Sequence, residues 1–293
     1  MAALASSTSP ASTGLASLTR QAPLAEPLSD LDAWVAYLHG AEIPVLDQTA
    51  DALEALRANE DNVDANMIGE MIATDPLMTL KVLAYAATHR TSRVVTDTET
   101  VTSALVLMGI SPFFAAFGPQ PTAEEWLVGH PAALAGLTES LRRAHRGANF
   151  ALAFAVHRMD PDAAAIHAAA LLHDFAEMLL WCHAPALAQR LKALYEAEPE
   201  LRYRDAQLRV LNIELAPLQQ ALMKAWRLPE LLTRMADDRH ASQPQARCVA
   251  LALRLARHSA RGWDEPAIAH DVSEIATLLT LSPAAALQLV QAI

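Results

Sequence analysis

His173 and Asp174 form the dipeptide in this sequence that is most suggestive of chemistry. Imidazole nitrogens and carboxylate oxygens are both metal ligands, and adjacent side chains near a helix end can reach one ion although they point about 100° apart. A metal-dependent phosphohydrolase also needs an upstream histidine and a further carboxylate, which hold the cation that polarises phosphate oxygens and activates water. His145 is the upstream candidate, so any metal set would comprise His145, His173 and Asp174.

The surroundings of the dipeptide decide its interpretation, because a second pair, His270-Asp271, occurs in an ordinary polar stretch. His173 and Asp174 lie within residues 168–180, a hydrophobic segment that predicts a helix able to bury them. A buried ionisable pair needs partners. One interpretation is a metal site. The other, which the residues alone favour, is a pair of polar core groups that hydrogen-bond across a helix interface.

No downstream carboxylate completes a metal set in a recognisable motif. The nearby acidic candidates are Asp205, Asp237 and Asp238. A working metal site requires several ligands. We therefore expect no catalytic residue, no cofactor and no metal, and we keep metal-dependent catalysis as the alternative.

Helices must position the dipeptide, because apolar residues recur at helical spacing after the N-terminal segment and no stretch alternates like a strand. The sequence predicts an all-α fold, a multi-helix bundle. A long helix is expected over residues 132–157, and Asp160-Pro161 precedes the helix that carries the dipeptide. Asp75-Pro76 is typical of a helix N-cap followed by proline at the first helical position.

Breaks in the helical pattern divide the chain into four predicted segments. Residues 1–27 are rich in Ala, Ser, Thr and Pro, which predicts a disordered tail. Glycines and prolines cluster between Phe117 and Pro131, so we expect a junction between two helical subdomains there. The predicted segments are the tail at 1–27, a first helical half at 28–120, a second helical half at 121–241 and a C-terminal helical extension at 242–293.

The composition argues against several classes of function. The 293 residues include 33 acidic and 22 basic side chains, and the net charge of -11 disfavours binding to nucleic acid. The basic stretch Arg142, Arg143, His145 and Arg146 is interpreted as a solvated helix face. No apolar run was found that approaches the roughly 20 residues of a membrane span, and no signal-peptide pattern opens the sequence. We therefore expect a soluble, cytoplasmic protein.

Several short motifs follow one another along the chain. Residues 43–46 read Ile-Pro-Val-Leu and residues 75–79 read Asp-Pro-Leu-Met-Thr. These segments resemble the opening of a domain of the HDOD family, whose members look like non-catalytic signalling relatives of HD phosphohydrolases. Further pieces follow in the family's order: residues 101–109 look like its alanine-leucine-glycine helix, 171–174 like its Leu-Leu-His-Asp signature and 226–229 like its Trp-x-Leu-Pro motif, and Arg239-His240 falls where paired histidines are common.

The resemblance covers about residues 40–241 and implies an N-terminal helical subdomain packed on an HD-like helical subdomain. It implies a remnant of an HD pocket formed by His145, His173, Asp174 and His240. Departures from the family's pattern remove potential ligands. Leu215 stands where a histidine is common, and Arg239 replaces one of the paired histidines.

The resemblance implies a bacterial signal-transduction protein that acts as a regulator or scaffold. Its expected partners are other signalling proteins, with a small-molecule ligand as a further possibility, and binding would change how the two halves pack. The alternative is a metal-dependent HD-type phosphohydrolase acting on nucleotides. A third hypothesis is a structural helical protein that retains the His-Asp pair only as a packing feature.

Overall fold

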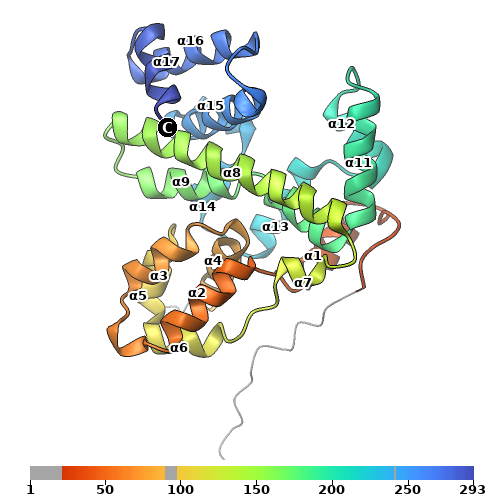
Figure 1. Cartoon of the computed structure of the whole chain (residues 1–293), viewed down its shortest axis with the longest axis vertical. Helices are drawn as coiled ribbons and strands as arrows, with labels where there is room; N and C mark the ends of the chain where they lie inside the picture. The colour runs from red at the N-terminus through yellow and green to blue at the C-terminus, as the bar shows by residue number, and fades with distance from the viewer. Residues whose placement is uncertain (1–21, 90–97, 241) are drawn as a thin grey trace, which may run out of the picture.

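The structure is a computed structural model, and it describes residues 22–89, 98–240 and 242–293. Within these ranges the chain is helical and contains no β-strand; the only extended pairing there is an isolated parallel bridge between Val45 and Thr122. The predicted all-α fold is confirmed. Figure 1 shows groups of shorter helices arranged around one long helix, α8.

The helices follow one another with short connections. The first group comprises α1 (Leu31–His39), α2 (Asp47–Arg57), α3 (Ala65–Ile72), α4 (Pro76–Thr88), α5 (Val101–Met108), α6 (Ile110–Ala116) and α7 (Ala123–Trp126). The middle group comprises α8 (Pro131–His157), α9 (Ala163–Leu171), α10 (Phe175–His183), α11 (Pro185–Ala197), α12 (Tyr203–Leu211), α13 (Leu215–Ala225) and α14 (Glu230–Met235). The last are α15 (Pro244–His258), α16 (Ala267–Leu279) and α17 (Pro283–Gln291), and short 3-10 turns lie at η1 (Glu60–Asn62), η2 (Asp238–His240) and η3 (Ser259–Arg261).

The buried carboxylate of Asp75 fixes the arrangement of α2 and α4. As predicted, Asp75 caps α4: its side chain accepts hydrogen bonds from the amides of Leu77 and Met78 at 2.8 and 3.1 Å. It also accepts one from the amide of Leu46, just before α2, at 2.9 Å. Burial raises the pKa of Asp75, and these backbone donors oppose that shift. The two sequence segments that open the domain are therefore joined through one side chain.

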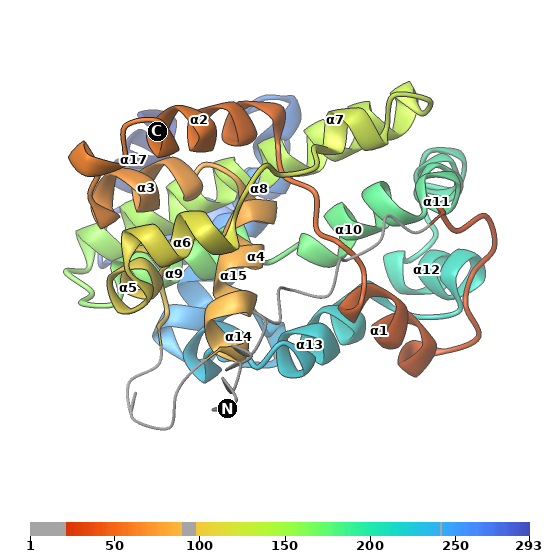
Figure 2. The ribbon, with the colours of Figure 1, turned by 90° about the horizontal axis from the view of Figure 1, so that it is seen from below.

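The long helix predicted over residues 132–157 is α8, which forms the axis of the fold. Helices α9, α10, α11 and α15 pack against it, as Figures 1 and 2 show. Two glycines of α8 permit close approaches by its neighbours. A Cβ at Gly136 would lie 2.5 Å from the Trp181 ring, and one at Gly147 would lie 2.5 Å from Leu253.

The prediction of an unbroken helix through His173 and Asp174 is wrong. α9 ends at Leu171 and α10 begins at Phe175, so the dipeptide lies in a three-residue turn between them. Apolar spacing continues through both helices and therefore hides the break. Aspartate favours positions just before a first helical turn over helix interiors, and Asp174 lies directly before α10.

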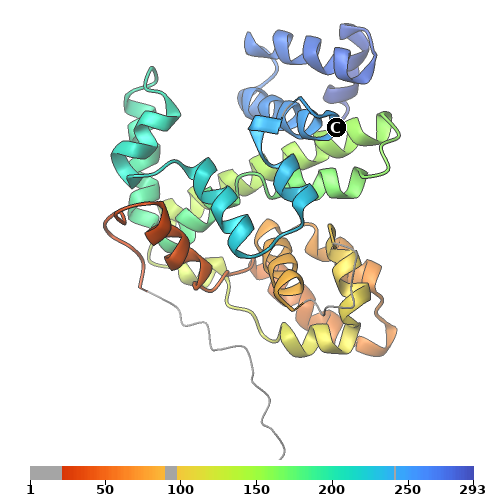
Figure 3. The same ribbon diagram turned by 180° about the vertical axis from the view of Figure 1, so that it is seen from behind.

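Helix α1 lies beside α13, although the two helices are far apart in the sequence (Figure 3). The Trp34 indole Nε1 donates a hydrogen bond of 3.0 Å to the Leu211 carbonyl at the end of α12. The amide of Leu24 donates one of 2.8 Å to the carbonyl of His183. Of the predicted tail at 1–27, residues 1–21 lie outside the described residues. The predicted segment boundaries stay predictions.

The second His-Asp dipeptide contributes to the C-terminal helices. Asp271 on α16 is buried and lies 2.7 Å from Arg254 Nε and 2.6 Å from His258 Nδ1, both on α15. These contacts join α15 to α16, and α15 in turn packs along α8. The stretch that looked ordinary in the sequence therefore holds an internal ion pair.

Among the described residues, one stretch is long and apolar enough to cross a membrane by length and composition, Ala163–His183. This stretch was not expected from the sequence, in which no apolar run approaches the length of a span. The pair α16 and α17 would add a second only as one span with a bend of 103°. Since 67% of the stretch's apolar window is buried inside the fold, against α8 and its neighbours, we interpret the stretch as core.

Candidate functional site

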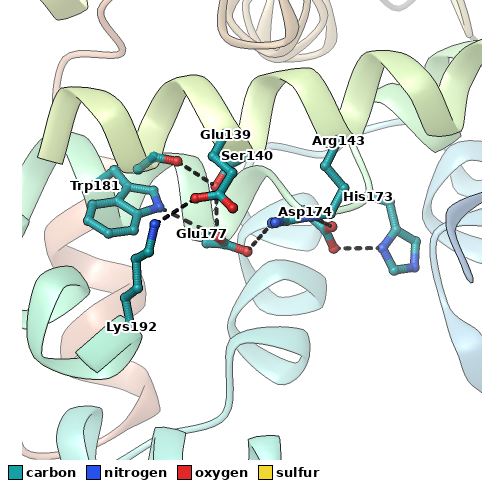
Figure 4. Close-up of polar contacts among 9 residues, drawn as sticks. Glu139, Ser140, Arg143, His173, Asp174, Glu177, Trp181 and Lys192 are labelled. Carbon is teal, nitrogen blue, oxygen red and sulfur yellow. Dashed lines mark hydrogen bonds and ion pairs between the residues drawn. The ribbon is translucent and has the colours of Figure 1, made fainter. Parts of the chain in front are cut away.

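The His-Asp pair lies where the turn before α10 faces α8 (Figure 4). His173 Nδ1 and Asp174 Oδ1 are 3.0 Å apart. Burial alone would raise the pKa of Asp174. The hydrogen bond from His173 and the positive charges nearby outweigh burial and hold the pKa of this carboxyl well below its ordinary value. Asp174 is therefore a carboxylate over the whole physiological pH range.

Arg143 on α8 is the counter-charge of this carboxylate. Its Nε lies 3.6 Å from Asp174 Oδ2, and its Nη2 donates a hydrogen bond of 2.6 Å to Glu177 Oε2. One guanidinium thus spans two carboxylates, one from the turn and one from the first turn of α10. Arginine suits this role because it presents several donors in a rigid plane and keeps its charge.

Glu177 extends the network along α8. The Ser140 hydroxyl lies 2.6 Å from Glu177 Oε1 and 3.1 Å from the carbonyl oxygen of Gly136. Trp181 Nε1 reaches the same carboxylate oxygen at 3.4 Å. These contacts, drawn in Figure 4, tie α10 to α8 in polar contacts over two helical turns. The carboxylates of Asp174 and Glu177 are thus bound by side chains of the protein itself.

The interpretation of the basic stretch as a solvated helix face is wrong for two of its residues. Arg143 is largely buried in the network just described. Arg146 donates a hydrogen bond of 2.8 Å to the carbonyl of Ser259, and its guanidinium lies 5.6 Å from the ring centres of both Phe150 and Trp263. Their positions on α8 point inward, which composition alone does not reveal.

His145, the predicted upstream ligand, is half-buried on α8. Burial lowers its pKa, and the charge of Asp75 opposes that shift. The pKa of His167 on α9 is lowered by burial and by the charge of His145. The Asp75 carboxylate, which caps α4, is therefore close enough to influence the charge state of His145.

His240, the last residue of the predicted remnant pocket, lies on η2. Its Nδ1 is 3.3 Å from Asp237 Oδ2. Arg239 also binds Asp237, with Nε at 2.9 Å from Oδ1 and Nη2 at 2.8 Å from Oδ2. The contacts described for His240 are thus local ones within the turn. That the four predicted residues form one pocket stays a prediction.

The donor set does not fit a metal ion. Within the described ranges no group of three or more His, Cys, Asp or Glu side chains is placed to hold one, and this includes the set His145, His173 and Asp174. The carboxylate of the pair is instead occupied by a histidine and an arginine. Arg143 and Glu177 were not predicted to belong to the site, although both lie at helical spacing from residues that face it.

Trp226 of the Trp-x-Leu-Pro motif packs against the start of α10, directly after the His-Asp turn. Its ring lies 5.9 Å from that of Phe175, the first residue of α10, and is stacked with His39 of α1 at 6.2 Å. Arg227 has a φ of 55°, and the Leu228 amide returns to the carbonyl of Met223, which closes α13. The motif ends one helix and places an indole against the start of another.

His183, at the end of α10, is a buried histidine that the sequence analysis did not single out. Its ring packs edge-on against Trp126 at 5.3 Å and Tyr37 at 6.2 Å. Burial lowers the pKa of His183 to about 4, against the opposing effect of a backbone hydrogen bond at Glu42. This imidazole is neutral at physiological pH.

These features define an all-helical protein with an HD-type His-Asp pair that arginine neutralises beside a long central helix. The model of the HDOD domain family matches residues 43–242, well over half of the chain, and the chain belongs to the HDOD family. The resemblance stated from the sequence is confirmed.

Solved structures share the fold. The MmoQ response regulator from Methylococcus capsulatus strain Bath matches with a TM-score of 0.60 at 17% identity, over 85% of this chain and 98% of that chain. A virulence factor from Campylobacter jejuni subsp. jejuni matches with a TM-score of 0.60 at 15% identity, over 89% of this chain and 97% of that chain. At such identities the likeness concerns the fold alone. No curated protein matches the chain.

Proposed function

We propose that this protein is a regulatory or scaffold component of bacterial signal transduction that acts by binding rather than by catalysis. The observation that carries the proposal is the position of Arg143, whose guanidinium contacts both Asp174 and Glu177. Part of the negative charge that would attract a metal ion is compensated by this guanidinium.

A divalent ion beside Asp174 would have to approach this guanidinium closely. Two like unit charges 4 Å apart repel by about 4 kcal/mol at an effective dielectric constant near 20, and a divalent ion doubles that figure. The second oxygen of the carboxylate is also engaged, by His173. These contacts favour a structural network over a hydrolytic centre.

Membership of the HDOD family supports a signalling function, and one structure with the same fold is described as a response regulator. The proposed partners are other signalling proteins, and the proposed location is the cytoplasm. The net charge of -11 argues against nucleic acid as a partner.

Metal analysis combined with turnover tests the proposal. We would purify wild type, Asp174→Ala and Arg143→Ala without chelator, measure bound iron, manganese and zinc, and assay hydrolysis of bis-p-nitrophenyl phosphate with each metal added. Arg142→Ala is the matched control, because Arg142 is the exposed neighbour of Arg143 on α8. We expect no stoichiometric metal and no turnover in wild type, and the same in the control.

Stoichiometric metal and turnover in wild type, both lost in Asp174→Ala, would instead establish the phosphohydrolase alternative. Metal binding that appears only in Arg143→Ala would support the proposal directly, since it would show that the guanidinium takes the place of the ion.

A further inference from the structure

A cavity of about 470 Å³ lies where α1, α4 and α6 meet Trp226. No residue of the network around Arg143 lines it, so this is a separate site. Its volume falls in the range of roughly 300 to 1,000 Å³ that is usual for small-molecule sites. Its walls come from segments far apart in the chain, since α4 and α6 lie within residues 76–116 and Trp226 follows α13.

Aromatic rings form a large part of the wall. Tyr85 is stacked on His89, with ring centres 3.9 Å apart and an angle of 20° between the planes. The Phe117 ring centre lies 5.1 Å from that of Tyr85. Trp226 also lines the cavity and is stacked with His39. Such rings present flat apolar surfaces, which planar ligands cover by offset stacking.

The polar part of the wall is a nearly buried ion pair. Lys81 and Glu42 are in contact, and their side chains are only 14% and 13% exposed. The ammonium also donates to the Ile43 carbonyl at 3.0 Å and to Gln120 Oε1 at 2.5 Å. An ammonium has three hydrogens, so these three partners use all of them. Among the described residues, the second carboxylate oxygen of Glu42 accepts no hydrogen bond.

We propose that this cavity binds a small, uncharged, planar heteroaromatic molecule that carries N–H donors. The aromatic wall selects a flat ring, and the free oxygen of Glu42 selects a donor. The charges of Lys81 and Glu42 cancel, and the ammonium has no hydrogen left for an anion. The inference goes beyond the proposed function, because binding here does not depend on what the His-Asp pair does.

Fluorescence of 2-aminopurine tests the proposal, because this planar base carries N–H donors and its emission is quenched when it stacks on aromatic rings. We expect saturable quenching by the full chain with one site and a dissociation constant on the order of 0.1 mM, as suits so small a ligand. Caffeine, a planar heterocycle without an N–H group, should compete at least tenfold more weakly than adenine.

Two alanine-to-tryptophan substitutions on α6 form a matched pair, of which only one fills the cavity. Ala116 lines the cavity, whereas its neighbour Ala115 on α6 is exposed and does not. Ala116→Trp should weaken 2-aminopurine binding at least tenfold, and Ala115→Trp should leave it unchanged. Circular dichroism and the Tm verify folding. If Ala116→Trp does not fold, Ala84→Leu replaces it, because Ala84 also lines the cavity.

Absence of saturable quenching up to about 5 mM would overturn the proposal, as would equal binding by a folded occluded variant. Equal competition by caffeine and adenine would overturn the assignment of the N–H donor to Glu42. None of these results bears on metal content or turnover, so failure here is distinguishable from failure of the proposed function.

Discussion

Replacing Arg143 by alanine removes the guanidinium that contacts both Asp174 and Glu177. Removal of one partner from a buried ion pair costs about 3–5 kcal/mol, because the remaining charge stays buried without compensation. The three side chains retain 22%, 19% and 32% exposure, so water screens part of that cost. We expect a loss of about 2–3 kcal/mol in the free energy of unfolding and, for a chain of 293 residues, a decrease in Tm of about 3–5 °C.

The pH dependence of the free energy of unfolding gives a second, independent test. The pKa of Asp174 is lowered in the folded state, so its contribution to stability is complete above the unfolded value of about 3.9 and is lost as the pH falls toward the folded value. Part of this lowering comes from Arg143. The difference in stability between wild type and Arg143→Ala should therefore shrink below about pH 4.

Urea denaturation followed by circular dichroism, repeated from pH 7 to pH 3, measures both effects. Arg142→Ala, at the exposed neighbouring position, should lie within about 0.5 kcal/mol of wild type. If Arg143→Ala behaves like Arg142→Ala at pH 7, or if its deficit persists unchanged at pH 3, the network does not stabilise the fold as argued.

Three further predictions concern the elements that support the site. Because the pKa of His183 is about 4 in the fold and about 6.5 when unfolded, wild type should lose up to roughly 3 kcal/mol between pH 6.5 and 4, and His183→Gln should flatten this slope in the same denaturation series. Gly136→Ala should cost about 1–3 kcal/mol in thermal unfolding because its methyl meets Trp181, whereas Gly129→Ala, with nothing within 4 Å of the new methyl, should be near neutral; equal effects would contradict the packing. Asp75→Ala should cost at least about 3 kcal/mol, since it strands three amides, against about 1 kcal/mol for the exposed cap Asp64→Ala; similar losses would refute the joining role of Asp75.

The sequence predicts much of the fold because its signals are local. The long helix at 132–157 and the cap at Asp75 follow from apolar spacing and from an aspartate before proline, and both are observed. The interruption at residues 172–174 was missed because the apolar pattern of α9 continues into α10. Periodicity reports which residues are buried, and it does not report where a buried helix stops.

The site is harder to predict, since it depends on which side chains face one another across helices. His173 and Asp174 were identified from their types, but the role of Arg143 depends on the rotation of α8 against α10. The same rotation places Arg146 against Phe150 and Trp263. The hydrogen bond from Leu46 to Asp75 spans 29 residues, and no local pattern encodes it.

The packing of α8 implies that different helices of the native state unfold locally at different free-energy costs. Its amides lie beneath α9, α10 and α15, so exchanging them with deuterium from water requires the surrounding helices to separate together. Helix α17 packs chiefly on α16, and α16 is held to the rest largely through α15. The C-terminal pair can therefore detach as a small cooperative unit while the hydrogen bonds of the central helix, and the carboxylates beside it, stay protected.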